Sequence, residues 1–224
     1  MMRMERNSTQ GQRGIALLCA LMITALLATL GAALVFVVTA DSLVDANHRA
    51  SQQGLYAADA GLERAIGELR RLSSWQLVPA PGGGSASVDF NDGALAPRIS
   101  DGRTLDLARL TTERQTESDL VYPAASDRPV WRLFGHASLN RMIAEARPAL
   151  PYVVVWIADD PDDRDGDPGR DSNDILIVRS CAFGVRGARR AVEATVFRDS
   201  ALDGAVAGGV ARSDVSLIAW REVR

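Results

Sequence analysis

The sequence is poor in the residues on which most catalytic and covalent sites depend. It has only two cysteines and two histidines in 224 residues. Cys19 lies in an apolar run and Cys181 in a predicted strand, so we expect no internal disulfide. His48 and His136 stand in no catalytic-triad or metal-binding spacing. We therefore expect a protein that is not an enzyme, with a metal-dependent hydrolase as the one enzymatic alternative.

Lysine is absent as well, and the charges are nearly balanced. All 25 basic residues are arginine, and they face 28 acidic residues, for a net charge of −3. The arginines form no concentrated basic patch. Nucleic-acid binding therefore has no support, because proteins that bind nucleic acids gather their basic residues on one face.

A long uncharged run near the start, from Ile15 to Ala40, is the main feature that the chain does have. As a helix of roughly 26 residues it would span roughly 39 Å, more than the ~30 Å hydrocarbon core of a bilayer. A secretory signal peptide is excluded, because its apolar stretch is only about 7–15 residues long. Two alternatives remain: a plain single-span anchor, or a prepilin-type leader that ends in Gly14 and precedes a retained helix.

The segment 1–14 carries positive charge, with Arg3, Arg6 and Arg13 against Glu5. Positive charge beside an apolar helix favours the cytoplasmic side of a membrane. We therefore expect residues 1–14 to be a cytoplasmic leader and residues 15–40 to cross the inner (cytoplasmic) membrane once. The C-terminal part of the chain would then be extracytoplasmic.

Residues 41–72 are expected to continue the same helix as an amphipathic half. They contain no proline, and their apolar residues recur at spacings of three and four, which places them on one stripe. These residues are Leu55, Ala58, Leu62, Ala65, Leu69 and Leu72. A plain anchor normally ends in a flexible linker, whereas this span is expected to be the first half of a packed element.

Two stretches carry a recognisable pattern. Gln12–Leu18 is a Gly-ended leader that enters an apolar helix, and Tyr56–Ala65 reads YAADAGLERA. Together they resemble the N-terminal region of the PilX-type minor pilins of type IV pili. The resemblance implies cleavage between Gly14 and Ile15 by prepilin peptidase and N-methylation of Ile15. It also implies a role in pilus initiation at the filament tip, with other minor pilins, the major pilin and inner-membrane lipid as partners.

Cys19 would be the fifth residue after the expected cleavage, where most pilins carry a glutamate. In that family the glutamate is understood to pair with the free amino terminus of a neighbouring subunit, because an unpaired carboxylate in lipid is costly. An apolar residue here indicates an initiating subunit, or is simply a small side chain of a membrane helix. The K-type minor pseudopilins of type II secretion systems also tend to lack this glutamate and are the first alternative. A generic membrane-anchored extracytoplasmic binding domain is the second.

The rest of the chain predicts a sheet after a variable loop region. In residues 73–150 we expect a short strand at Ala86–Phe90, a turn at 91–93, helix or loop at Asp101–Asp119, and helical spacing over Trp131–Ala146. β-Branched segments predict strands at Tyr152–Ile157, Ile175–Phe183, Arg190–Phe197 and Val215–Val223. Their short connections predict an antiparallel meander over 151–224, packed on the helix stripe. The expected fold class is α+β, a pilin-like "lollipop" with a long N-terminal helix on an antiparallel β-sheet.

The connection 159–174, here named the Asp-rich loop, is the candidate metal site. It holds eight aspartates and two arginines. Carboxylate oxygens without His or Cys nearby favour calcium, and their alternation resembles the first half of an EF-hand loop without its final glutamate. The expected ligands are Asp159, Asp160, Asp163, Asp165, Asp167 and Asn173. A solvated acidic hairpin loop is the alternative.

Overall fold

The computed structural model describes residues 10–83, 88–123, 128–143, 150–199 and 214–223. Two compact units make up the chain, residues 1–48 and residues 49–224. Helix α1 (Gln10–Leu69) contributes to both units, and the other elements all belong to the second.

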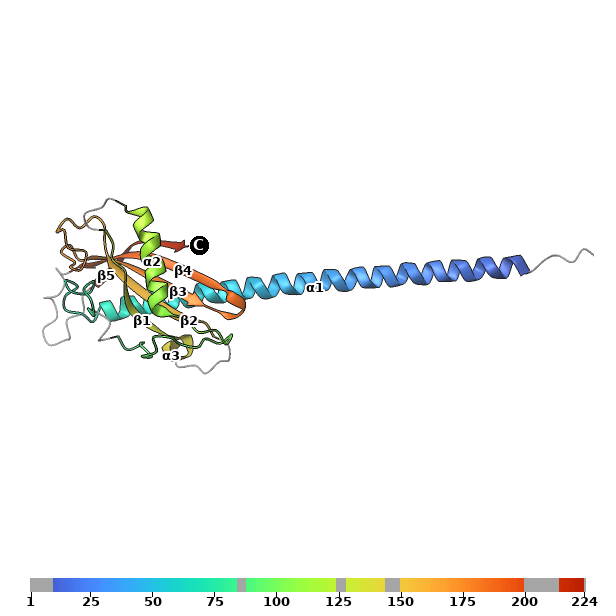
Figure 1. Ribbon diagram of the computed structural model, residues 1–224, viewed down its shortest axis with the longest axis horizontal. Coiled ribbons are helices and arrows are strands. Elements are labelled where there is room, and N and C mark those ends of the chain that lie inside the picture. The colour runs from blue at the N-terminus through green and yellow to red at the C-terminus, as the bar shows by residue number, and fades with distance from the viewer. Residues whose placement is uncertain (1–9, 84–87, 124–127, 144–149, 200–213, 224) are drawn as a thin grey trace, which may run out of the picture. The chain divides into compact units, whose positions relative to one another are not determined.

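An antiparallel sheet of five strands forms the centre of the second unit (Figure 1). Its strands are β1 (Arg132–Ser138), β2 (Tyr152–Asp159), β3 (Ile175–Phe183), β4 (Arg189–Asp199) and β5 (Asp214–Val223). Each strand pairs with the next along the chain. The meander and the strands predicted after residue 151 are therefore confirmed. The turn between β3 and β4 is the short 3₁₀ helix η2 (Val185–Gly187), where Arg186 and Gly187 adopt positive φ angles of 56° and 78°.

The segment before residue 150 contains more regular structure than the sequence predicts. The helix expected over Trp131–Ala146 is wrong in its first half, which is strand β1. Of the residues described in that range, those of α3 (Leu139–Ile143) are helical, and residues 144–146 lie outside the described residues. The register of β1 against β2 shifts between Leu133 and Gly135, which disturbs the alternation of apolar residues that marks a strand. In the strand expected at Ala86–Phe90, residues 88–90 are not in a strand, and residues 86 and 87 lie outside the described residues.

Helix α2 (Leu107–Val121) occupies most of the segment Asp101–Asp119, for which the sequence predicts either helix or loop. Asp106 is its N-cap, with the side-chain carboxylate accepting a hydrogen bond from the Arg109 backbone N–H at 2.9 Å. Such a cap satisfies one of the backbone donors that the first turn of a helix leaves unpaired. Residues 73–150 are therefore not all loop.

Both faces of the sheet are covered, so the second unit has three layers (Figure 1). Along β2, Val153, Val155 and Ile157 face the core that includes α1. Their neighbours Val154, Trp156 and Ala158 face a second core beneath α2. The Trp156 indole Nε1 donates a hydrogen bond to the Thr111 hydroxyl of α2 at 2.8 Å. Burial on both sides explains why β2 is an unbroken apolar run rather than an alternating one.

The stripe predicted on the second half of α1 packs against the sheet. Ala58, Leu62, Ala65 and Leu69 are buried, while Leu55 and Leu72 are partly buried beside them. Gly61 lies at the closest approach, since a Cβ atom there would lie less than 3.0 Å from both Val153 Cγ1 and Ser180 Oγ. The absent side chain is thus what lets the helix reach the strands.

The C-terminus of α1 is closed by a buried tryptophan. The Trp75 indole is fully buried and donates a hydrogen bond from Nε1 to the Leu69 carbonyl at 3.1 Å. The same carbonyl also accepts the Leu72 backbone N–H at 3.1 Å, so the indole adds a second hydrogen bond at the last residue of the helix. The chain therefore turns back onto the sheet immediately after the helix.

Replacing Gly61 by alanine should destabilise the second unit. Overpacking of a filled core costs about 1–3 kcal/mol, which over most of that range exceeds the ~1 kcal/mol by which alanine favours a helix over glycine. Gly67→Ala is the matched control on the same helix, because a Cβ there meets nothing within 4 Å. Thermal unfolding of the full chain in detergent should show a lower Tm for G61A and an equal or higher Tm for G67A. Equal shifts in both variants would contradict the close approach.

Candidate functional site

The first unit consists of a helix whose apolar side chains are exposed. The large apolar residues from Ile15 to Val38 are 56–77 % exposed. Among the described residues, one helix is long and apolar enough to cross a membrane. The hydroxyls of Thr24, Thr29 and Thr39 each donate to a carbonyl three or four residues earlier, at 2.8–2.9 Å. These hydroxyls therefore present no unpaired donor, as lipid requires. The helix suggests a single-pass membrane anchor.

The residues expected for processing all lie on this helix. Gly14, Ile15 and Cys19 are exposed members of α1. A Cβ at Gly14 would meet nothing within 4 Å. Cys19 and Cys181 are both free cysteines in the structure. Burial raises the pKa of the Cys181 thiol, so this second cysteine is an inert core residue.

In the Asp-rich loop, three of the predicted metal ligands come together. One carboxylate oxygen each from Asp159, Asp160 and Asp163 lies within 4.8 Å of the other two. The side chains are 1 %, 5 % and 4 % exposed, respectively. Neither carboxylate oxygen of Asp159 has a hydrogen-bond partner among the described residues. This arrangement is not that of a solvated acidic hairpin, because its central carboxylates are buried.

The other three predicted ligands do not belong to this group. Asp165 and Asp167 each accept a hydrogen bond from the backbone N–H two residues on, at 2.8 Å and 3.0 Å, and both are exposed. Their alternation with other residues thus builds successive Asx turns. The Asn173 amide donates from Nδ2 to Asp160 Oδ1 at 2.8 Å, and its oxygen accepts from the Ile175 N–H at 2.9 Å. Asn173 therefore orients a carboxylate instead of offering a free oxygen.

Asp171 is a fourth buried carboxylate of the loop, and it is not among the ligands predicted from the sequence. It is 3 % exposed, and its Oδ2 has no hydrogen-bond partner among the described residues. Burial, together with the neighbouring carboxylates of Asp171, Asp163 and Asp160, raises the pKa of Asp159 to about 8. Burial also raises the pKa of Asp171 to about 6. Four carboxylates thus share one buried region.

Asp163 is the member of the group that its neighbours stabilise as an anion. Burial raises its pKa, but hydrogen bonds from the Ser172 hydroxyl and backbone N–H, at 2.6 Å and 2.7 Å, together with the backbone N–H groups of Asp165 and Arg164, lower it overall. Ser172 lies nine residues further along the chain than Asp163. The two halves of the Asp-rich loop are therefore joined through this carboxylate.

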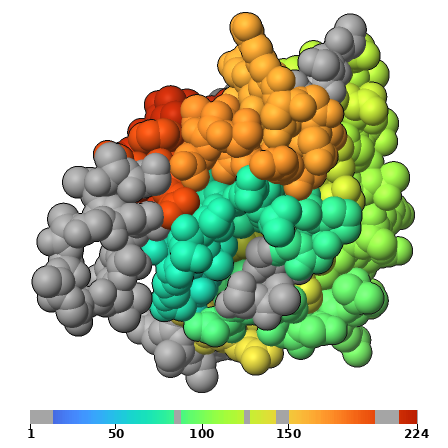
Figure 2. All heavy atoms as spheres, turned by 90° about the vertical axis from the view of Figure 1, so that its left-hand side faces the viewer, coloured from blue at the N-terminus to red at the C-terminus, as the bar shows by residue number. Residues whose placement is uncertain are grey.

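The loop also docks on the chain that follows α1. The Asp171 N–H donates to the Gln76 carbonyl at 3.1 Å. Arg198, 6 % exposed, contacts Asp174 at 3.3 Å and donates to the Ser73 carbonyl at 2.5 Å. Figure 2 shows the loop, in orange, lying beside this segment, in teal. The contact explains why aspartates in a connecting loop are buried. No local sequence pattern predicts that a residue as distant as Arg198 contacts Asp174 and Ser73.

His136 belongs to a buried network that the sequence does not indicate. Its Nδ1 lies 2.9 Å from the Tyr152 hydroxyl and 3.1 Å from Asp92 Oδ1. The Tyr152 hydroxyl donates in turn to Asp92 Oδ2 at 2.7 Å. Burial lowers the pKa of His136, although Asp92 raises it in part. All three groups have partners, so the network ties residue 92 to the sheet instead of forming a reactive site.

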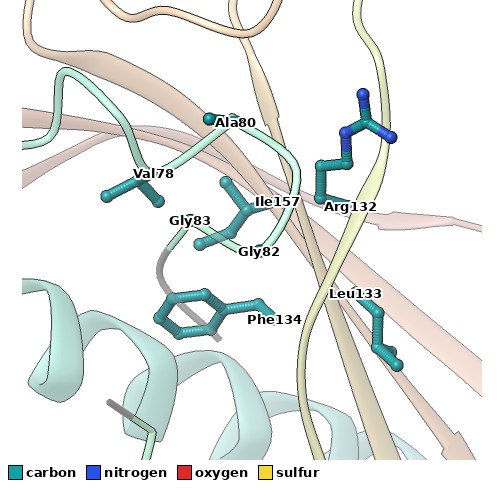
Figure 3. A pocket seen from close by; sticks show the side chains of 8 residues that line it. All are labelled: Val78, Ala80, Gly82, Gly83, Arg132, Leu133, Phe134 and Ile157. Carbon is teal, nitrogen blue, oxygen red and sulfur yellow. The ribbon is translucent and has the colours of Figure 1, made fainter. Parts of the chain in front are cut away.

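A small pocket lies between the turn after α1 and the first two strands (Figure 3). It is lined by Val78, Ala80, Gly82, Gly83, Arg132, Leu133, Phe134 and Ile157. Arg132 is the one charged residue of this lining, and no acid, base or nucleophile accompanies it. The pocket therefore supports no catalytic role.

The family model described as "PilX N-terminal" matches residues 13–63. The matched segment lies on α1 and includes Gly14, Cys19 and Gly61. The match confirms the resemblance drawn from the sequence and supports a PilX-type minor pilin of type IV pili. No curated protein and no solved structure matches the chain.

The His136 network should make stability depend on pH in one direction. Because burial lowers the pKa of His136 below 6.5 in the folded chain, folding favours the neutral ring. Its contribution to the free energy of unfolding is then full above about pH 6.5 and is lost as the pH falls through the lowered pKa. Relative to His136→Gln, the unmodified chain should lose stability between pH 7 and pH 5 in denaturant titrations. His48→Gln, at an exposed position on α1, is the control and should follow the unmodified chain. Parallel profiles for H136Q and the unmodified chain would contradict this account.

Proposed function

We propose that this PilX-type minor pilin initiates or caps a type IV pilus at the filament tip, as a structural subunit without catalytic activity. The apolar half of α1 holds the chain in the inner membrane, with the second unit on the extracytoplasmic side. After cleavage between Gly14 and Ile15 and methylation of Ile15, the same helix leaves the lipid and joins a bundle of pilin helices. The match over residues 13–63 supports the pilin assignment.

Exposed apolar surface supplies the physical reason for this transfer. Side chains such as Leu17, Leu21 and Phe36 are more than half exposed and need either lipid or other apolar helices around them. A bundle of like helices buries the same surface that the bilayer buries. Minor pilins and the major pilin are therefore the partners that this helix fits.

Cys19 is the observation that carries the tip position. A glutamate at that position is useful to a subunit that docks beneath an earlier one, because the carboxylate then finds an amino terminus. The first subunit of a filament has no earlier neighbour, and a carboxylate would remain unpaired at a cost of about 3 kcal/mol in the membrane. An apolar Cys19 removes that cost.

Processing can be tested at the mature N-terminus. Mass spectrometry of the chain from cells with active prepilin peptidase should show a start at Ile15 with one added methyl group. Gly14→Val should retain the leader, whereas Gly31→Ala should be processed normally. Both glycines have open space for a Cβ, so neither change creates a clash within the helix. An intact Met1 in the unmodified chain would rule out both the pilus assignment and the type II secretion alternative.

The tip position can be tested with Cys19 itself. In a strain lacking the native gene, Cys19→Ala should restore the number of surface pili counted by electron microscopy. Cys19→Glu should restore few, because its carboxylate has no partner at the tip. Full restoration by both variants would contradict the tip position. If deletion of the gene abolished protein secretion and left pilus number unchanged, the K-type pseudopilin would replace this proposal.

A further inference from the structure

The strongest unexplained feature of the second unit is Asp159, at the end of strand β2. Its side chain is 99 % buried, and neither oxygen has a hydrogen-bond partner among the described residues. Removing a charged group from water without a partner is strongly unfavourable. Buried polar groups in folded proteins almost always have a partner, which can be an ion. Asp159 therefore needs a partner that the described residues do not supply.

The carboxylates of Asp160 and Asp163 lie beside this side chain, and that of Asp171 is close enough to act on it electrostatically. Ligand oxygens of Asp160 and Asp163 lie within 4.8 Å of one another and of an Asp159 oxygen. Asp171 is also buried, and its Oδ2 is unpartnered among the described residues. Two oxygens on opposite sides of a calcium ion are separated by about 5 Å, since each bond is about 2.3–2.6 Å long. The spacing therefore fits oxygens that share a single ion.

The donor set selects the kind of ion. All four side chains offer hard carboxylate oxygens, which favour calcium, magnesium or manganese over zinc or copper. Calcium accepts many carboxylates in a flexible arrangement, whereas magnesium demands near-ideal octahedral geometry and usually retains several waters. Four carboxylates on one irregular loop match the preference of calcium.

We propose that Asp159, Asp160, Asp163 and Asp171 bind one calcium ion, which joins the end of β2 to both halves of the Asp-rich loop. Asp165 and Asp167 take no part, because their side chains are exposed and lie outside the buried carboxylates. Asn173 holds Asp160 in place through its amide. This site stands on the fold of the second unit and does not depend on the proposed pilin function.

Calcium would also strengthen the contact between the loop and the chain after α1. Asp171 would hold the ion with its carboxylate, while its backbone N–H already bonds the Gln76 carbonyl. Arg198 ties the next part of the loop, at Asp174, to the Ser73 carbonyl. An ion bound only by the folded chain stabilises it by mass action.

The experiment uses the full chain in detergent, treated with a chelator and then titrated with calcium chloride at constant ionic strength. At calcium about 100-fold above its dissociation constant, the Tm of the unmodified chain should rise by about 5–10 °C. Asp159→Asn should lose this rise. Asp165→Asn removes the same charge from the same loop and should keep it. Isothermal titration calorimetry should find one ion per unmodified chain.

Several results would overturn the proposal. One is the absence of any calcium-dependent rise in Tm, which would mean that a proton on the buried carboxylates takes the place of an ion. Another is an equal loss of the rise in D159N and D165N, which would indicate diffuse charge screening. An equal rise with magnesium chloride would contradict calcium as the ion. If D159N does not fold, Asp171→Asn replaces it, and calcium heat retained in that variant would also count against the site.

Discussion

The close contact between the second half of α1 and the sheet is the constraint on which the rest of the second unit depends. Gly61 allows the helix to approach Val153 and Ser180. The buried residues around it, Ala57, Ala58 and Ala65, have small side chains and so also permit a short distance between helix and sheet. A helix with larger residues there would lie further from the strands, and the core between α1 and the sheet would not be closely packed. The segment matched by the PilX family model contains the apolar span and Ala57, Ala58 and Gly61 of this contact, and it ends before Ala65.

Strand β2 connects this contact to the acidic group. One of its faces packs on α1 and the other on α2, so its last residue, Asp159, is buried when the strand ends. The chain after α1 contacts the Asp-rich loop directly through the Gln76 carbonyl, and Arg198 links Ser73 to Asp174 of the loop. Where the loop docks, Asp159, Asp160, Asp163 and Asp171 are buried, whereas Asp165 and Asp167 lie in its exposed part.

Local patterns predicted the parts of the fold that local forces decide. The apolar stripe of α1 through Leu62 and the β-branched strands could be predicted, because residues buried at regular intervals give a regular pattern of apolar residues in the sequence. Strand β1 was missed because its bulge interrupts that period. Helix α2 was uncertain because only Leu107 and Ser118 of its residues are buried, so it has almost no apolar stripe. In the acidic loop, sequence alternation suggested Asp165 and Asp167, yet turn geometry uses those carboxylates and brings Asp171 in from the other half.

The sequence by itself determined the membrane-length helix, its amphipathic continuation and the resemblance to minor pilins, because length, charge and periodicity are properties of neighbouring residues. Only the tertiary structure decided that the sheet has a second covering layer. It also decided which aspartates face one another and where Arg198 finds its partners. Such contacts join residues far apart in the chain, and their geometry depends on how all the layers pack together.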